Sequence, residues 1–371
     1  MISLYFHIPF CKRKCNYCDF YSISDEEGDK VREYIESLKK EIILRKTDEK
    51  VESIFWGGGT PSLLKENDFS EIADFIRANF DLLPDCEWTI EANPESFSEE
   101  KAQLWLNKGV NRLSLGVQSL NDDELKICGR LHDAQQATAV LKSKIIEKFS
   151  SVNVDLIYGL PLQTAASFES TLRTVCETPC LAHLSLYELS VGENTHFSWE
   201  REKYNFPSEE ELAKMMDISR QILTANGFER YEVSNFAKEG KRCRHNENYW
   251  KDGQYMGFGA AAHSFDGRRR CANHSELSLY TDSLDYGELP VSFCEKMDSK
   301  RRRLEFLMLN LRTVDGFSVS AFRRKFKSDV LLQNEKYVQK LVKDGLMVVE
   351  DDVCKLTDKG LDMADGVAAR L

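Results

Sequence analysis

Strand-like and helix-like segments alternate over the first two-thirds of the chain, and this alternation limits its fold more than any other feature. Short apolar runs are each followed by a stretch in which apolar residues recur every three or four positions, the spacing of an amphipathic helix. Expected strands cover 4–7, 51–56, 88–91, 112–116, 152–158 and 183–189, and expected helices cover 31–46, 69–76, 99–107, 134–149, 167–176 and 208–226. Six such repeats predict an α/β fold with a parallel sheet covered by helices. The periodicity leaves open whether the sheet stays open or curls into a partial barrel.

The pattern changes after about residue 235. Glycine and aromatic residues are frequent from 235 to 288, and helical periodicity returns at 300–311. Further helices are expected at 319–326 and 337–344, a short hairpin at 348–356 and a last helix from 357. Helices followed by a small hairpin are typical of a winged-helix-like domain. The sequence therefore predicts three parts, namely a core at 1–235, a connecting segment at 236–295 and a smaller C-terminal helical domain at 296–371.

Charge and composition exclude several classes of protein. The chain has 371 residues, with 50 Lys and Arg against 61 Asp and Glu, so its formal net charge is −11. Proteins that follow a phosphate backbone carry a basic face, so nucleic acid is not an expected partner. No apolar run reaches the roughly 18 residues that a transmembrane helix needs, and residues 1–7 do not resemble a signal peptide. We therefore expect a cytoplasmic protein with no transmembrane segment.

Three of the 11 cysteines, Cys11, Cys15 and Cys18, lie close together directly after the first expected strand. The spacing C-x3-C-x2-C lets one loop reach three corners of an iron–sulfur cluster and leaves one iron without a protein ligand. The basic residues 12–14 between them would favour thiolates. A zinc site or three free thiols stay open as alternatives, although structural zinc usually needs a fourth ligand. In a reducing compartment, the other cysteines are expected to be small buried residues rather than disulfides.

With Tyr17 before its last cysteine, this motif resembles the signature of radical S-adenosylmethionine (SAM) enzymes. The resemblance implies a 4Fe-4S cluster on Cys11, Cys15 and Cys18, with the amino and carboxylate groups of SAM on the fourth iron. It also implies that the core is a partial (β/α)6 barrel of the TIM type, which agrees with the six repeats.

Further polar residues and a glycine turn, Gly57–Pro61, follow the ends of the expected strands. The similarity implies that the glycine turn contacts the amino group of SAM, that carboxylates approach its ribose hydroxyls and that an arginine approaches its carboxylate. Each residue alone could be an ordinary capping or ion-pair residue, but their repetition at one sheet edge favours a site. The SAM-binding residues predicted in this way are Tyr5, Gly58, Gly59, Thr60, Glu91, Gln118, Arg130 and Asp155.

Two longer motifs, at 6–11 and 155–161, resemble the oxygen-independent coproporphyrinogen III oxidase group, which has a decarboxylating branch and a HemW-type heme chaperone branch. The enzyme branch carries a further cysteine where this chain has Phe20, and a segment ahead of the first strand for which this sequence leaves no room. The run 245–250 (HNENYW) matches the H-N-x-x-Y-W signature of the chaperone branch, which is linked with heme binding. His245 can offer a nitrogen to iron, and Tyr249 and Trp250 can lie against the macrocycle. A structural loop is the alternative.

The sequence thus predicts a heme chaperone on a radical SAM scaffold, with a 4Fe-4S cluster, SAM and heme. Its expected partners are a heme acceptor protein and an electron donor. Two alternatives stay open: a coproporphyrinogen III oxidase of porphyrin biosynthesis, and a binding protein whose cluster merely stabilises the fold. No catalytic residue is assigned.

Overall fold

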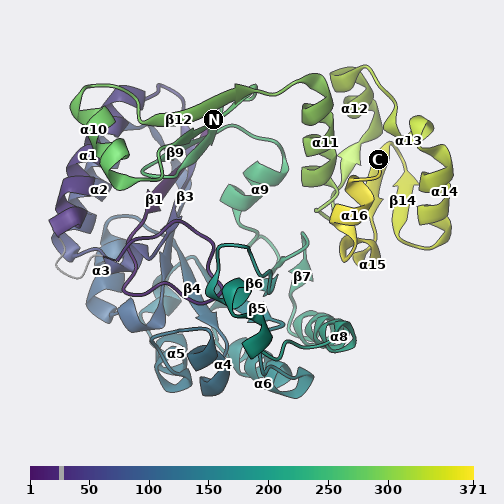
Figure 1. The fold of residues 1–371 in the computed structure, drawn as a ribbon, viewed down its shortest axis with the longest axis horizontal. Coiled ribbons are helices and arrows are strands. Elements are labelled where there is room, and N and C mark those ends of the chain that lie inside the picture. The colour runs from purple at the N-terminus through teal and green to yellow at the C-terminus, as the bar shows by residue number, and fades with distance from the viewer. Residues whose placement is uncertain (25–28) are drawn as a thin grey trace.

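Six parallel strands lie side by side in chain order at the centre of the core (Figure 1). The computed structural model describes residues 1–24 and 29–371. The strands are β1 (Ile2–Ile8), β2 (Val51–Gly58), β3 (Leu82–Ala92), β4 (Arg112–Gln118), β5 (Ser151–Tyr158) and β6 (Leu181–Glu188). Each pairs in parallel with the next. Within the described residues the sheet does not close on itself. The predicted α/β class with a partial barrel is therefore confirmed.

Helices cover the outer face of this sheet (Figure 1). They are α1 (Asp29–Arg45), α2 (Glu66–Asn79), α3 (Glu99–Asn107), α4 (Asp122–Ile127), α5 (Ala134–Leu141), α6 (Ala165–Cys176) and α8 (Glu209–Ala225). The helix expected at 134–149 ends early, at Leu141, because the Ser143 hydroxyl accepts a hydrogen bond from the Ile145 amide and so competes with the helix.

The two faces of the strands differ in character, since successive side chains of a strand point to opposite sides. Trp56, Trp88 and Leu113 point outward into the main hydrophobic core beneath the helices. The intervening positions face the interior of the partial barrel and are largely polar, as at Glu91 and Ser114. The interior is therefore a polar lumen rather than a second hydrophobic core.

Short strands extend the sheet at both edges. Two join it beyond β6, and four join it beyond β1, so that the whole sheet has 12 strands. They are β7 (Glu229–Arg230), β8 (Asn235–Ala237), β9 (Tyr255–Phe258), β10 (His263–Phe265), β11 (Arg269–Asn273) and β12 (Val291–Lys296). The segment expected to be a connector, 236–295, thus contributes to the same sheet as the core. Hydrophobic periodicity did not predict these strands because they are short and are interrupted by glycines and charged residues.

A buried carboxylate fixes these added strands to the core. Glu41 of α1 is fully buried and accepts hydrogen bonds from the Gly259 amide, Asn273 Nδ2 and the Tyr280 hydroxyl, each at 2.8 Å. Arg45 Nη1 lies 2.7 Å from the same carboxylate. Four donors thus compensate the cost of burying this charge.

Two cysteines that were expected to be unpaired form a disulfide. Cys271 of β11 and Cys294 of β12 are directly opposite each other in an antiparallel pair, and their sulfurs are bonded. The expectation that the scattered cysteines avoid disulfides is wrong for this pair, because the strand register that joins them was not visible in the sequence.

The C-terminal part folds around its own hydrophobic core and stands beside the barrel (Figure 1). Its elements are α11 (Ser299–Asn310), β13 (Phe317–Ser318), α12 (Val319–Phe326), α13 (Val330–Gln333), α14 (Glu335–Lys343), β14 (Met347–Glu350), β15 (Val353–Leu356), α15 (Asp358–Leu361) and α16 (Ala364–Ala368). Helices followed by a small antiparallel sheet agree with the expected winged-helix-like arrangement.

Three further helices belong to the first 295 residues: α7 (His196–Trp199) follows β6, α9 (Arg244–Trp250) follows β8, and α10 (Leu277–Asp285) packs against α1 (Figure 1). No helix within 1–24 and 29–371 has the length and apolar character needed to cross a bilayer.

Candidate functional site

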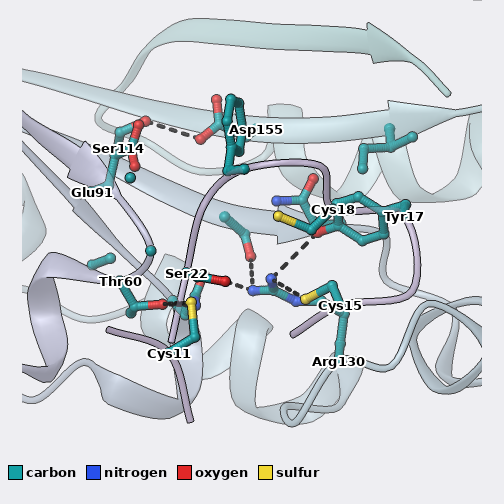
Figure 2. Close-up of a pocket in the computed structure, with 18 of the residues that line it drawn as sticks. Cys11, Cys15, Tyr17, Cys18, Ser22, Thr60, Glu91, Ser114, Arg130 and Asp155 are labelled. Carbon is teal, nitrogen blue, oxygen red and sulfur yellow. Dashed lines mark hydrogen bonds between the residues drawn. The ribbon is translucent and has the colours of Figure 1, made fainter. Parts of the chain in front are cut away.

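A cavity of about 370 Å³ opens at the carboxyl ends of the central strands (Figure 2). Ligand sites of α/β folds lie at this edge. The cavity brings together most of the residues predicted from the sequence. Those that line it are Cys11, Cys15, Cys18, Gly58, Gly59, Thr60, Glu91, Gln118, Arg130 and Asp155.

The cysteine loop between β1 and α1 is held by backbone hydrogen bonds. The Cys11 amide donates to the Ile23 carbonyl at 3.0 Å, and the Asn16 amide donates to the Cys128 carbonyl at 2.9 Å. All three motif cysteines are half-buried, and burial raises the pKa of the Cys11 and Cys18 thiols. The neighbouring lysines and Arg13 therefore do not make these thiols acidic on their own. A metal must displace the protons when it binds.

The thiols point into the cavity from different sides (Figure 2). Cys11 Sγ lies 3.6 Å from Thr60 Oγ1, and Cys15 Sγ accepts a hydrogen bond from Arg130 at 3.5 Å. Within the described residues, no three His, Cys, Asp or Glu side chains converge on the position of a single ion. In a cubane each cysteine binds a different iron, so separated thiols on one loop fit a cluster.

The glycine turn at the end of β2 allows the cysteine loop to approach closely. Gly58 has φ +111°, and a Cβ there would lie 2.5 Å from the His7 ring. A Cβ on Gly59 would lie 2.7 Å from the Phe10 carbonyl oxygen. A side chain at Gly58 would collide with His7 of β1, and one at Gly59 with the backbone of the cysteine loop, so the turn requires glycine.

Arg130 connects the cysteine loop to the strands. Its Nη1 donates to Cys15 Sγ and, at 3.4 Å, to the Tyr17 hydroxyl, while its Nη2 donates to Asn93 Oδ1 at 2.7 Å and to the Gly116 carbonyl at 2.8 Å. Its Nε is buried without a partner among the described residues. A buried donor of this kind fits a carboxylate ligand beside the cluster loop.

Two partly buried carboxyl groups form the inner wall of the cavity. Asp155 accepts hydrogen bonds from the Ser114 hydroxyl at 3.0 Å and from Asn153 Nδ2 at 2.8 Å. Burial, and then the neighbouring Asp155, raise the pKa of Glu91 to about 8. Glu91 is therefore protonated near neutral pH, so it can donate a hydrogen bond to a hydroxyl as well as accept one.

Sequence reasoning missed Arg112, which lies on the inner face of β4. Its side chain is 3% exposed, lines the cavity and makes no hydrogen bond or ion pair with any described residue. Its charge lowers the pKa of Asp155, although burial raises that pKa by more. Arg112 precedes the inward-facing Ser114 by two residues, so the strand period could have indicated it.

Four of the predicted residues are not among the described residues that line this cavity, namely Tyr5, His245, Tyr249 and Trp250. The Tyr5 hydroxyl hydrogen-bonds to His7 Nδ1 at 3.1 Å. His245 is 1% exposed, and its two ring nitrogens are engaged, Nδ1 with Ser53 Oγ and Nε2 with the Tyr249 hydroxyl, both at 2.9 Å. Trp250 packs under Arg312, whose guanidinium carbon lies 5.4 Å from the ring centroid. His245 thus has no free nitrogen for iron in this conformation.

Another residue of α9, Asn246, does line the cavity. The helix is held against the lumen by Glu87 of β3, which accepts hydrogen bonds from the Arg244 amide at 3.1 Å and the His245 amide at 3.0 Å. A carboxylate at a helix N-terminus is favourable because it satisfies free amides and meets the positive end of the helix dipole. The HNENYW run is therefore a helix inserted against the barrel interior.

Comparison with known proteins identifies the family of this fold. A family model described as "Radical SAM superfamily" matches residues 5–175, and one described as "HemN C-terminal domain" matches residues 297–363. The solved structure of coproporphyrinogen III oxidase (HemN) from Escherichia coli, described as a radical SAM enzyme, is 26% identical with a TM-score of 0.88, covering 100% of this chain and 89% of that chain. The fold is that of a radical SAM protein.

Curated relatives indicate the group within this superfamily to which the chain belongs. "Heme chaperone HemW" of Bacillus subtilis (strain 168) is 33% identical over 368 residues, which are 97% of this chain and 96% of that protein. The protein of the same name from Escherichia coli (strain K12) is 38% identical over 266 residues, 71% of this chain and 69% of that protein. The chain belongs to the HemN-like family of the radical SAM superfamily, in the group of the HemW-type heme chaperones.

Replacing a motif cysteine should prevent cluster assembly if, as predicted, each of the three thiolates binds a different iron. We expect Cys15→Ala to lower the iron content of anaerobically reconstituted protein from about four per chain to less than one. The matched control is Cys128→Ala, since Cys128 is buried next to the cysteine loop but lies outside the motif. Equal iron loss in both variants would contradict this ligand set.

Glu91 should make the metal-free protein less stable as the pH rises. The unfolded state loses the Glu91 proton near pH 4.5, whereas the folded state keeps it to about pH 8, so stability falls between these values by up to about 5 kcal/mol. In urea unfolding, Glu91→Gln and wild type should be similarly stable near pH 5, and the variant more stable at pH 8. Glu188→Gln, an exposed carboxyl on the same cavity, should show no such gain. A wild-type advantage that persists at pH 8 would refute the raised pKa.

Proposed function

We propose that this protein is a cytoplasmic heme chaperone that binds a 4Fe-4S cluster, SAM and heme, and passes heme to an acceptor protein. The observation that carries the proposal is the similarity over nearly the whole chain to proteins named heme chaperone. The cavity supports the part that concerns the cluster and SAM, since three cysteines and a buried arginine with a free donor line it together.

Each residue of the cavity has a role that its chemistry allows. Cys11, Cys15 and Cys18 would hold the cluster, which, once reduced by an electron donor, supplies one-electron cleavage of SAM. Gly58, Gly59 and Thr60 would present backbone and hydroxyl groups to the methionine end of SAM. Arg130 would bind its carboxylate through Nε, and Glu91 and Asp155 would hold the ribose hydroxyls, while Gln118 lines the end of β4.

A second candidate function is oxygen-independent coproporphyrinogen III oxidase. The observation in its favour is the fold of the Escherichia coli enzyme, which covers this whole chain with a TM-score of 0.88. The curated relatives that match over the full length carry the chaperone name instead, and on that ground the chaperone is preferred.

An anaerobic assay distinguishes these functions. Reconstituted protein should bind heme with a Soret band, release it to a heme-free acceptor hemoprotein, and form no protoporphyrinogen from coproporphyrinogen III when a reductant and SAM are present. Hemoprotein without added chaperone controls for spontaneous transfer. Formation of protoporphyrinogen would refute the chaperone proposal in favour of the oxidase.

The predicted heme contacts His245, Tyr249 and Trp250 can be tested in the same protein. Because both ring nitrogens of His245 are hydrogen-bonded, we expect His245→Ala to leave the Soret maximum unchanged and to lower the free energy of unfolding by about 1–3 kcal/mol through the lost buried hydrogen bonds. Ser53→Ala is the control, since it removes one of these hydrogen bonds and leaves the imidazole in place. A Soret shift in His245→Ala but not in Ser53→Ala would show that the imidazole binds iron.

A further inference from the structure

Three large side chains that line the cavity are exposed to solvent. Phe20 is 69% exposed, Leu131 43% and Tyr187 41%, and all three line the cavity. They come from separate segments: the cysteine loop, the connection between α4 and α5, and the end of β6. A single exposed apolar residue needs no explanation, but several around one opening mark a binding surface.

Two cations at the same opening lack partners. Lys12 and Lys14 are exposed, line the cavity and make no hydrogen bond or ion pair with any described residue. Arg13 between them is engaged differently, since its Nε and Nη2 donate to the Gly129 carbonyl at 3.1 Å and 2.6 Å. In a chain of net charge −11, two unpaired lysines beside a cavity select for an anion. We call Lys12, Lys14, Phe20, Leu131 and Tyr187 the cavity rim.

Apolar and cationic groups together define the chemistry of the ligand. A flat apolar body can cover Phe20, Leu131 and Tyr187, and carboxylates at its edge can reach the lysines. This inference rests on the proposed function, because heme is a planar ligand with two propionates. Helix α9 is the competing location, but there both nitrogens of His245 are already hydrogen-bonded.

We propose that heme binds across the cavity rim, with one macrocycle face against Phe20, Leu131 and Tyr187 and its propionates toward Lys12 and Lys14. Heme in this position covers the mouth of the cavity that holds the cluster cysteines. Recognition then needs contact with the porphyrin face and its carboxylates, and does not need the imidazole of His245.

The test uses full-length, anaerobically reconstituted protein titrated with heme. Phe20→Ala and Leu131→Ala together remove most of the apolar contact, so we expect heme affinity to fall about 10-fold or more. The matched control is Trp199→Ala, because Trp199 is also 69% exposed but lies outside the residues that line the cavity. Cluster absorbance and SAM affinity, measured on each variant, show that the site itself remains intact.

The charged half of the rim is tested by changing the ligand. Wild type should bind heme more tightly than heme dimethyl ester, and the double variant Lys12→Gln, Lys14→Gln should bind the two about equally. Lys355→Gln, an exposed lysine on β15, should behave like wild type. The two ligands are compared on the same protein, so a change in folding would weaken both and would not change the ratio of their affinities.

The outcomes separate the two proposals. Weaker binding by the Phe20, Leu131 variant, with Trp199→Ala unchanged, supports the rim. Unchanged heme affinity in all rim variants, while wild type binds heme, overturns the rim and leaves the proposed function standing. Failure of wild type to bind heme overturns both.

Discussion

The alternation of side chains along the parallel strands determines both the stability of this protein and the position of its site. Outward positions hold Trp56, Trp88 and other apolar residues that form the main core. Inward positions hold charged and polar groups, including Glu91, Arg112 and Asp155. Buried charges cost free energy unless they are paired or hydrogen-bonded. Keeping these charged groups in the lumen therefore costs folding free energy. The groups whose pKa values are shifted lie at the site, where a ligand can interact with them.

The cysteine loop depends on the same arrangement. Glycines at the end of β2 let its backbone lie against the strand, and Arg130 reaches from the α4–α5 connection to Cys15. Backbone hydrogen bonds fix the path of the loop. The three thiols are therefore held in the cavity by the backbone, without any bond between them. A loop preorganised in this way binds a cluster with a smaller loss of conformational entropy than a flexible one.

Much of the fold and of the cavity could be predicted from the sequence. The six central strands and their parallel pairing follow from the alternation of strand and helix patterns, while their order was first seen in the structure. Residues after parallel strands meet at one edge, which is why Glu91 and Asp155 were found. The strands between 255 and 296 were missed because they are short, and so was the cross-strand pair Cys271 and Cys294. Strand periodicity could have placed Arg112 on the inner face, but only the structure shows that it makes no hydrogen bond or ion pair with the described residues.

The HNENYW motif shows the same limit and bears on where the proposed heme ligand would bind. Its residue types suit a heme site. In the folded chain, however, the Arg244 and His245 amides donate hydrogen bonds to the Glu87 carboxylate, and the His245 ring is hydrogen-bonded to Ser53 and Tyr249. Freeing the imidazole breaks two buried hydrogen bonds, and each unmatched partner costs about 1–3 kcal/mol. Withdrawing the helix would also expose the Glu87 carboxylate and separate Trp250 from Arg312 of the C-terminal domain. A ligand at the cavity rim requires none of these changes, because Phe20 and the two lysines are already exposed and unpaired in the described part of the chain.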